Sequence, residues 1–263
     1  MPSRCISGRA RSRQARRRRR EAAAEAPLAA AEVEAEAEAR DWANGLGTDL
    51  LLAILGLVDH ADILMSADCV CRSWRRAARG EPTLWRRVVM RGGHAGIARR
   101  LNRCGAACEA VRRGARLCEA FCVQYAADDG FLIYLSEMAP YLKSLRLICC
   151  DDVTEERFAE AVKELPLLEE LELSLCHNVG GSRVYKVVGD ACTQLKHFRL
   201  NKHSIGPGIL EWWQNVDKDV LGIASMHGLR SLQLFSNYLT SKGLETILDN
   251  CPQLESLDIR RCS

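Results

Sequence analysis

The strongest constraint on the fold is a short apolar template that recurs through the second half of the chain. Apolar residues occupy its first, fourth and sixth positions, and the copies begin 24, 26, 27, 34 and 25 residues apart. A unit of this length cannot bury its own apolar surface, so successive units must stack into a solenoid. The six copies are Cys118-x-x-Phe121-x-Val123, which is the weakest, Leu142-x-x-Leu145-x-Leu147, Leu168-x-x-Leu171-x-Leu173, Leu195-x-x-Phe198-x-Leu200, Leu229-x-x-Leu232-x-Leu234 and Leu254-x-x-Leu257-x-Ile259.

The spacing is typical of leucine-rich repeats (LRRs), in which each template forms a short strand and a helix follows it. Helical patterns lie between the templates, at residues 130–139, 155–165, 184–191, 219–225 and 241–249. We therefore predict an α/β fold, with a parallel sheet on the concave side of an arc and helices outside it. The arc covers residues 117–263 in about six repeats, the last of which is incomplete because the sequence stops directly after a strand. Repeat arrays normally need a polar cap, so we expect a truncated or partner-covered end.

Thirteen cysteines are an odd number, and none forms a CxxC pair. No apolar run approaches the roughly 18 residues of a membrane span, and we expect no signal peptide. These features favour a reducing compartment, the nucleus and/or the cytoplasm, and we expect no metal or other cofactor. Five cysteines recur in register with the templates, which predicts a ladder of small buried thiols. They are Cys150, Cys176 and Cys262 after strands, and Cys192 and Cys251 before them.

Charge is concentrated in residues 1–40, which we expect to be disordered. Residues 1–20 carry nine arginines and no acid, residues 21–40 have a net charge of −5, and the remainder has a net charge of −1. The arginine block fits a nuclear-import signal, a polyanion contact, an organellar transit peptide or a solvated tail without function. A nearly neutral body argues against a folded nucleic-acid-binding domain.

Residues 41–91 form a densely apolar segment that predicts three helices. Thr48 is the expected N-cap of the first, Asp62 caps a longer second helix that ends at Gly80, and Pro82 starts a short third. A unit of about 45 residues is close to the lower limit for an independent core, so a partner or the next domain must cover some of its apolar side chains. We expect a helical connector at residues 92–116.

This segment resembles an F-box. The similarity rests on Leu46, Asp49-Leu50-Leu51, Ile54-Leu55, Ile63-Leu64, the VCRSW run at residues 70–74 and Leu84-Trp85. It implies binding to the Skp-type adaptor, and through it to the cullin, of an SCF ubiquitin ligase. F-boxes usually have Leu-Pro where this chain has Leu46-Gly47, which predicts weaker docking. The implied adaptor contacts are Leu46, Leu50, Leu51, Ile54, Leu55, Val70, Cys71 and Trp74.

Together, the F-box and the cysteine-containing repeats resemble plant F-box/LRR-repeat proteins. A target protein would then meet the strand residues that face out of the concave sheet and a long insertion with two adjacent tryptophans. Any one of these residues is equally well explained as a solvated or packing position. The predicted target contacts are Arg146, Glu170, Glu172, His197, Arg199, Gln233, Phe235, Asp258 and Arg260, with Trp212 and Trp213 from the insertion.

No nucleophile elbow, phosphate-binding glycine loop, HExxH motif or paired catalytic carboxylate is present, so we do not expect an enzyme. The first hypothesis is a substrate-recognition subunit of an SCF-type cullin–RING ubiquitin ligase. The second is an LRR interaction scaffold with a weakened F-box and no role in ubiquitination. A third is a nucleic-acid-binding protein that depends on its arginine tail.

Overall fold

The computed structural model describes residues 46–91, 103–202 and 216–262. The chain divides into two compact units, residues 1–51 and 52–263, and each is described by itself. Helix α2 (Thr48–Leu55) begins in the first unit. The Gly47 carbonyl oxygen accepts a hydrogen bond from the Leu51 amide at 3.1 Å. This places Gly47 at the N-cap, so the prediction that Thr48 caps the helix is wrong by one residue.

The helix expected from Asp62 to Gly80 is divided into short pieces. They are α3 (His60–Asp62), the π-helix η2 (Ile63–Ala67), α4 (Asp68–Val70) and α5 (Arg72–Gly80). Asp59 is the cap, because its carboxylate accepts a hydrogen bond from the Ala61 amide at 2.9 Å. Asp62 therefore lies inside the first turn, where the helix dipole favours an acidic side chain.

An extended residue separates α4 from α5. Cys71 has φ −157° and ψ 176°, so the helical backbone is interrupted at this point. Across the interruption, Nε of Arg75 donates to the carbonyl oxygen of Asp68 at 2.7 Å. The Arg75 side chain thus supplies the hydrogen bond that this carbonyl loses where the helix is interrupted. The prediction of one continuous helix to Gly80 is therefore wrong. The 3₁₀ turn η3 (Pro82–Trp85) follows, with Pro82 at its start as expected.

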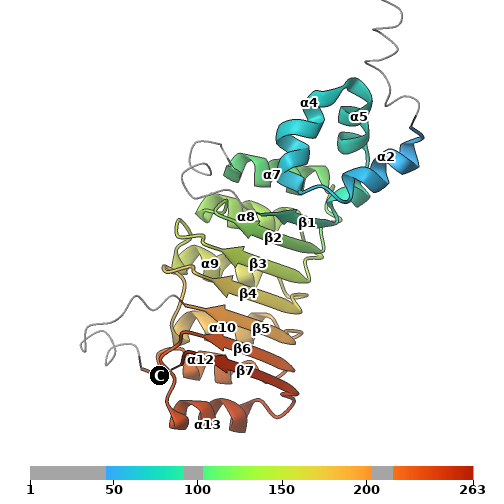
Figure 1. Ribbon diagram of the computed structural model, residues 1–263. Helices are drawn as coiled ribbons and strands as arrows, with labels where there is room; N and C mark the ends of the chain where they lie inside the picture. The colour runs from blue at the N-terminus through green and yellow to red at the C-terminus, as the bar shows by residue number, and fades with distance from the viewer. Residues whose placement is uncertain (1–45, 92–102, 203–215, 263) are drawn as a thin grey trace, which may run out of the picture. The chain divides into compact units, whose positions relative to one another are not determined.

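The second unit contains a seven-stranded parallel sheet in the order of the sequence, β1 to β7 (Figure 1). Six strands coincide with the six templates, and this confirms the predicted F-box plus LRR fold class. The strands are β1 (Arg87–Met90), β2 (Ala120–Gln124), β3 (Ser144–Ile148), β4 (Glu170–Ser174), β5 (His197–Asn201), β6 (Ser231–Phe235) and β7 (Ser256–Arg260).

The seventh strand, β1, consists of the last residues of the F-box-like segment. It pairs with β2 in parallel, with Val88 opposite Phe121 and Met90 opposite Val123. The buried Trp85 occupies the first template position, so Trp85-x-x-Val88-x-Met90 is one more copy. The amide of Val89 also donates to Nδ1 of the buried His60 at 3.2 Å. The sheet therefore starts before the expected connector.

Helices lie on one side of the sheet in Figure 1, in the crossovers between strands. Three of them begin with the side-chain caps expected for Asp and Thr: Asp128 accepts from the Phe131 amide, Thr154 from Arg157 and Thr240 from Gly243. None of the described helices is long and apolar enough to cross a bilayer. They are α7 (Arg103–Arg113), α8 (Asp129–Met138), α9 (Glu155–Lys163), α10 (Ser182–Ala191), α12 (Val220–Ala224) and α13 (Ser241–Asn250).

The core lies between the sheet and these helices, because alternate strand residues point to opposite faces. In β3, Leu145 and Leu147 are buried while Ser144, Arg146 and Ile148 are partly exposed. The same alternation holds in β6. We call the face away from the helices the open face.

The residue after most strands has a left-handed backbone, and the next residue returns into the core. Tyr125, Cys149, Leu175, Ser236 and Arg261 have φ between 53° and 58°. The thiols that follow satisfy backbone carbonyls. Sγ of Cys150 lies 3.4 Å from the Ile148 oxygen, Sγ of Cys176 lies 3.4 Å from that of Leu147, and Sγ of Cys262 lies 3.5 Å from that of Leu234. After β6, Asn237 takes the place of the cysteine, and its side-chain Nδ2 donates to the Leu200 carbonyl oxygen at 3.2 Å.

Candidate interaction sites

The expected adaptor contacts differ in exposure. In the first unit, Leu50 is 53% exposed, whereas Leu51 is buried. In the second unit, Val70 is 53% exposed and Leu55 is fully buried. Leu46, Ile54, Cys71 and Trp74 are intermediate. Two of the eight residues therefore present most of a large apolar side chain to solvent.

Two exposed apolar residues of this segment were missed by sequence reasoning. Leu57 is 90% exposed and Met65 is 42% exposed. Both fall off the helical spacing of the buried residues, and that spacing was the basis of the prediction. An apolar side chain that breaks the inward pattern was the available signal, since it has no core to enter.

A polar row crosses the middle of the open face. Strand register aligns Arg146 of β3, Glu172 of β4, Arg199 of β5 and Gln233 of β6. Nε of Arg146 donates to Oε2 of Glu172 at 2.6 Å, and Nε of Arg199 donates to Oε1 of Gln233 at 2.6 Å. Nη1 of Arg199 lies 3.7 Å from Oε1 of Glu172. The charged residues that occupy the same position in successive repeats thus pair with one another across the strands.

The row borders a hollow of about 250 Å³. Six of the eleven predicted target contacts line it: Arg146, Glu170, Glu172, His197, Arg199 and Gln233. Glu172 is only 5% exposed, and Ser174 also donates to it at 2.8 Å. The Glu172 carboxylate therefore holds the two arginines in position, and a partner would contact the more exposed side chains around it.

Three other predicted contacts meet on β6 and β7. The Arg260 guanidinium lies 5.4 Å from the centre of the Phe235 ring and forms an ion pair with Asp258 at 2.7 Å. The two tryptophans of the insertion, Trp212 and Trp213, lie outside the described residues.

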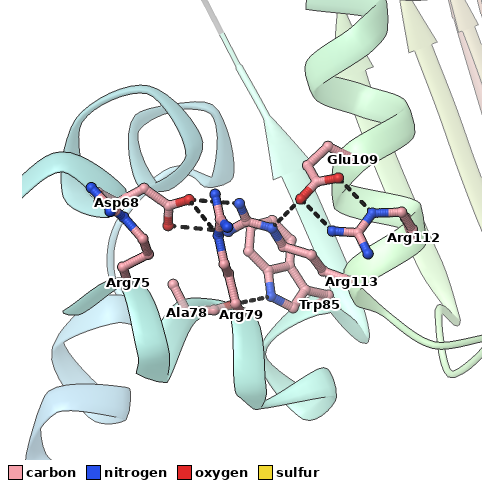
Figure 2. A network of polar contacts seen from close by, with 8 residues as sticks. All are labelled: Asp68, Arg75, Ala78, Arg79, Trp85, Glu109, Arg112 and Arg113. Atoms are coloured by element: carbon pink, nitrogen blue, oxygen red, sulfur yellow. Dashed lines mark hydrogen bonds and ion pairs between the residues drawn. The ribbon is translucent and has the colours of Figure 1, made fainter. Parts of the chain in front are cut away.

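A buried ion pair connects the helices of the F-box-like segment to α7 (Figure 2). The Asp68 carboxylate accepts from both Nη atoms of Arg113, at 3.1 and 2.6 Å. Nε of Arg113 donates to Glu109 at 2.8 Å, and its guanidinium lies 5.1 Å from the centre of the Trp85 ring. Arg79 approaches Asp68 at 3.5 Å. We call Asp68, Arg113, Glu109 and Trp85 the joint.

The joint also affects a titrating group. Arg112, with Arg113, hydrogen-bonds the Glu109 carboxylate and lowers its pKa to about 2. Sequence reasoning missed the joint, because Asp68 and Arg113 are 45 residues apart.

Comparison with known proteins gives consistent matches. An F-box-like family profile matches residues 46–91. The chain is 39% identical to the F-box protein SKIP19 of Arabidopsis thaliana over 218 residues, 82% of this chain and 68% of the relative. It is 38% identical to Putative F-box/LRR-repeat protein 22 of the same plant, over 84% of this chain and 69% of the relative.

A third relative is longer. Putative F-box/LRR-repeat protein 23 of Arabidopsis thaliana is 35% identical over 224 residues, which are 85% of this chain. The match covers 48% of that relative, so the chain spans about half its length.

Proposed function

Because the chain belongs to the F-box/LRR-repeat protein family, we propose that it is a substrate-recognition subunit of an SCF-type cullin–RING ubiquitin ligase. The F-box-like segment would bind the Skp-type adaptor, and through it the cullin, while the open face binds a target protein. F-box proteins are in general non-catalytic, so this chain would promote ubiquitin transfer by holding the target close to the ubiquitin carrier.

The observation that carries the proposal is the F-box-like match over residues 46–91, a segment that keeps large apolar side chains in solvent. Leu57, Met65 and Val70 are exposed there within the second unit. An exposed apolar side chain gains free energy when a partner covers it, at about 25 cal/mol per Å². Adaptor binding would cover these side chains, which the described residues of this chain leave exposed.

A charge at Val70 tests adaptor docking. We expect Val70→Glu to weaken capture of the purified adaptor by about tenfold or more, because a buried, unpaired carboxylate is costly. The fold should tolerate the change, since Val70 is half exposed. Leu221→Glu is the matched control, because Leu221 of α12 is 71% exposed and lies in the repeats. Equal loss in both variants, or in neither, would contradict docking through this segment.

Gly47 supports a second candidate function, an LRR scaffold with a weakened F-box. Among the described residues other than its chain neighbours, no heavy atom lies within 4 Å of the position that a Cβ would take at Gly47, so a side chain has room there. We expect Gly47→Pro to tighten adaptor binding by about 0.4–1 kcal/mol, a severalfold gain, because the unbound chain loses conformational freedom. If neither wild type nor Gly47→Pro captures the adaptor in titration calorimetry, the scaffold function replaces the ligase function.

A further inference from the structure

Two arginines on the open face flank a strand and have unused hydrogen-bond donors. Arg146 of β3 and Arg199 of β5 stand on either side of Glu172 in register, and their side chains are 34% and 42% exposed. Nε of Arg146 donates a hydrogen bond to Glu172, and Nε of Arg199 donates one to Gln233. Within the described residues, the Nη groups of both arginines make no hydrogen bond. Nη1 of Arg199 is in ion-pair range of Glu172 at 3.7 Å but forms no hydrogen bond with it, so both arginines line the hollow with donors to spare.

The arginines are also held in place before any partner arrives. The Nε bonds of 2.6 Å and the buried Glu172 carboxylate between them restrict both guanidiniums. Fixing a side chain in advance lowers the entropy lost on binding. A planar guanidinium with Nε engaged presents its outer Nη groups to an acceptor with two oxygens.

The charge balance selects the kind of acceptor. The two guanidiniums and Glu172 give the row one net positive charge, and Glu170, which also lines the hollow, brings these four charged side chains to neutrality. A carboxylate brings one negative charge close to Glu170 and Glu172, whereas a phosphate dianion brings up to two, so the carboxylate is the acceptor that these two side chains repel less. Resting on the proposed function, we infer that Arg146 and Arg199 form a clamp for a single aspartate or glutamate side chain of the target.

Peptide selection on the full chain bound to its adaptor tests the clamp. A phage-displayed library of random peptides is the probe, and enriched sequences are synthesised for fluorescence anisotropy. We expect an acidic residue at one fixed position, and an about tenfold loss when it is replaced by its amide, since charge-assisted bonds are about twice as strong as neutral ones. Phosphoserine at that position should bind no better than the acid.

Variants assign the contact to the two arginines. Arg146→Lys and Arg199→Lys keep a cation beside Glu172 but remove the planar fork, so each should weaken the acidic peptide by about tenfold. Arg157→Lys is the control, because Arg157 is on α9 and pairs with Glu160 at 2.6 Å. Thermal unfolding checks that each variant is folded.

The outcomes separate the clamp from the ligase function. Enriched peptides without a fixed acid, undiminished binding to both lysine variants, or tighter binding of phosphoserine would overturn the clamp. If the adaptor is captured but no acidic peptide is enriched, the clamp is refuted and the ligase proposal stands. If no adaptor is captured, the ligase proposal fails, and the same selection on the chain alone decides the clamp.

Discussion

Breaking the joint should lower the free energy of unfolding more than breaking any of the exposed ion pairs among the described residues. Arg113→Met removes both Nη bonds to Asp68 and leaves a carboxylate whose side chain is only 7% exposed. Removing one partner of a buried pair typically costs about 3–5 kcal/mol. Arg79, at 3.5 Å from Asp68, offsets part of this. We expect the free energy of unfolding to fall by about 3 kcal/mol, near the lower end of that range.

A double variant separates the ion pair from packing. Asp68→Leu with Arg113→Met replaces both charges by apolar groups, and buried pairs replaced in this way are often neutral or stabilising. The double variant should therefore recover most of the stability that Arg113→Met loses, with a small deficit because Glu109 loses one of two partners. Urea unfolding followed by circular dichroism measures the free energy of unfolding of the wild type and both variants, and the spectra without urea check that each protein is folded.

The control for this series is Arg157→Met, which removes an exposed pair on α9 and should leave the unfolding midpoint unchanged. The reasoning is refuted if Arg113→Met is no less stable than this control. It is also refuted if the double variant is as unstable as the single one, because the loss would then come from the methylene groups and the Trp85 contact.

Three further predictions follow from local geometry. In Gly222→Ala the new Cβ would lie 2.5 Å from the Ser182 carbonyl oxygen, so thermal unfolding should show a loss of about 1–3 kcal/mol, whereas Gly80→Ala, with open space around it, should show none. Because the pKa of Glu109 is lowered from 4.5 to about 2, the stability it contributes is fully present above about pH 5 and is lost as the pH falls toward 2. Glu109→Gln should therefore flatten the curve of melting temperature against pH in this range, and an unchanged curve would exclude this role. Burial raises the pKa of Cys118 and Cys192 to about 12, so iodoacetamide should label the exposed Cys69 in the native chain and these two thiols only after denaturation. Peptide mass spectrometry measures the labelling, and early labelling of Cys192 would contradict its burial.

The strands were predictable because their signal is local. Each template repeats an alternation that one strand needs, with inward residues such as Leu171 and Leu173 and outward residues such as Glu170. Stacking then follows from the repeat length alone. Strand β1 was missed because Trp85, Val88 and Met90 carry the template in different residue types, inside a segment already explained as an F-box.

The site was less predictable, because its properties depend on partners distant in sequence. The outward positions Arg146, Glu172 and Arg199 follow from the alternation, but their pairing depends on the register between repeats. Sequence charge alone treats Glu172 as an available contact, and only its burial beneath two arginines shows that it supports them. Asp68 looked like an ordinary helix residue for the same reason, since its partner is on a helix that begins 35 residues later.

The shared strand β1 limits how this protein can be taken apart or recombined. A chimera that exchanges residues 46–91 for those of a relative would import a foreign edge into the sheet, together with Trp85 and half of the joint. Deleting the same residues would leave β2 with a row of unpaired amides and carbonyls, the kind of edge that promotes aggregation. The F-box-like segment and the repeats are therefore expected to be inherited together.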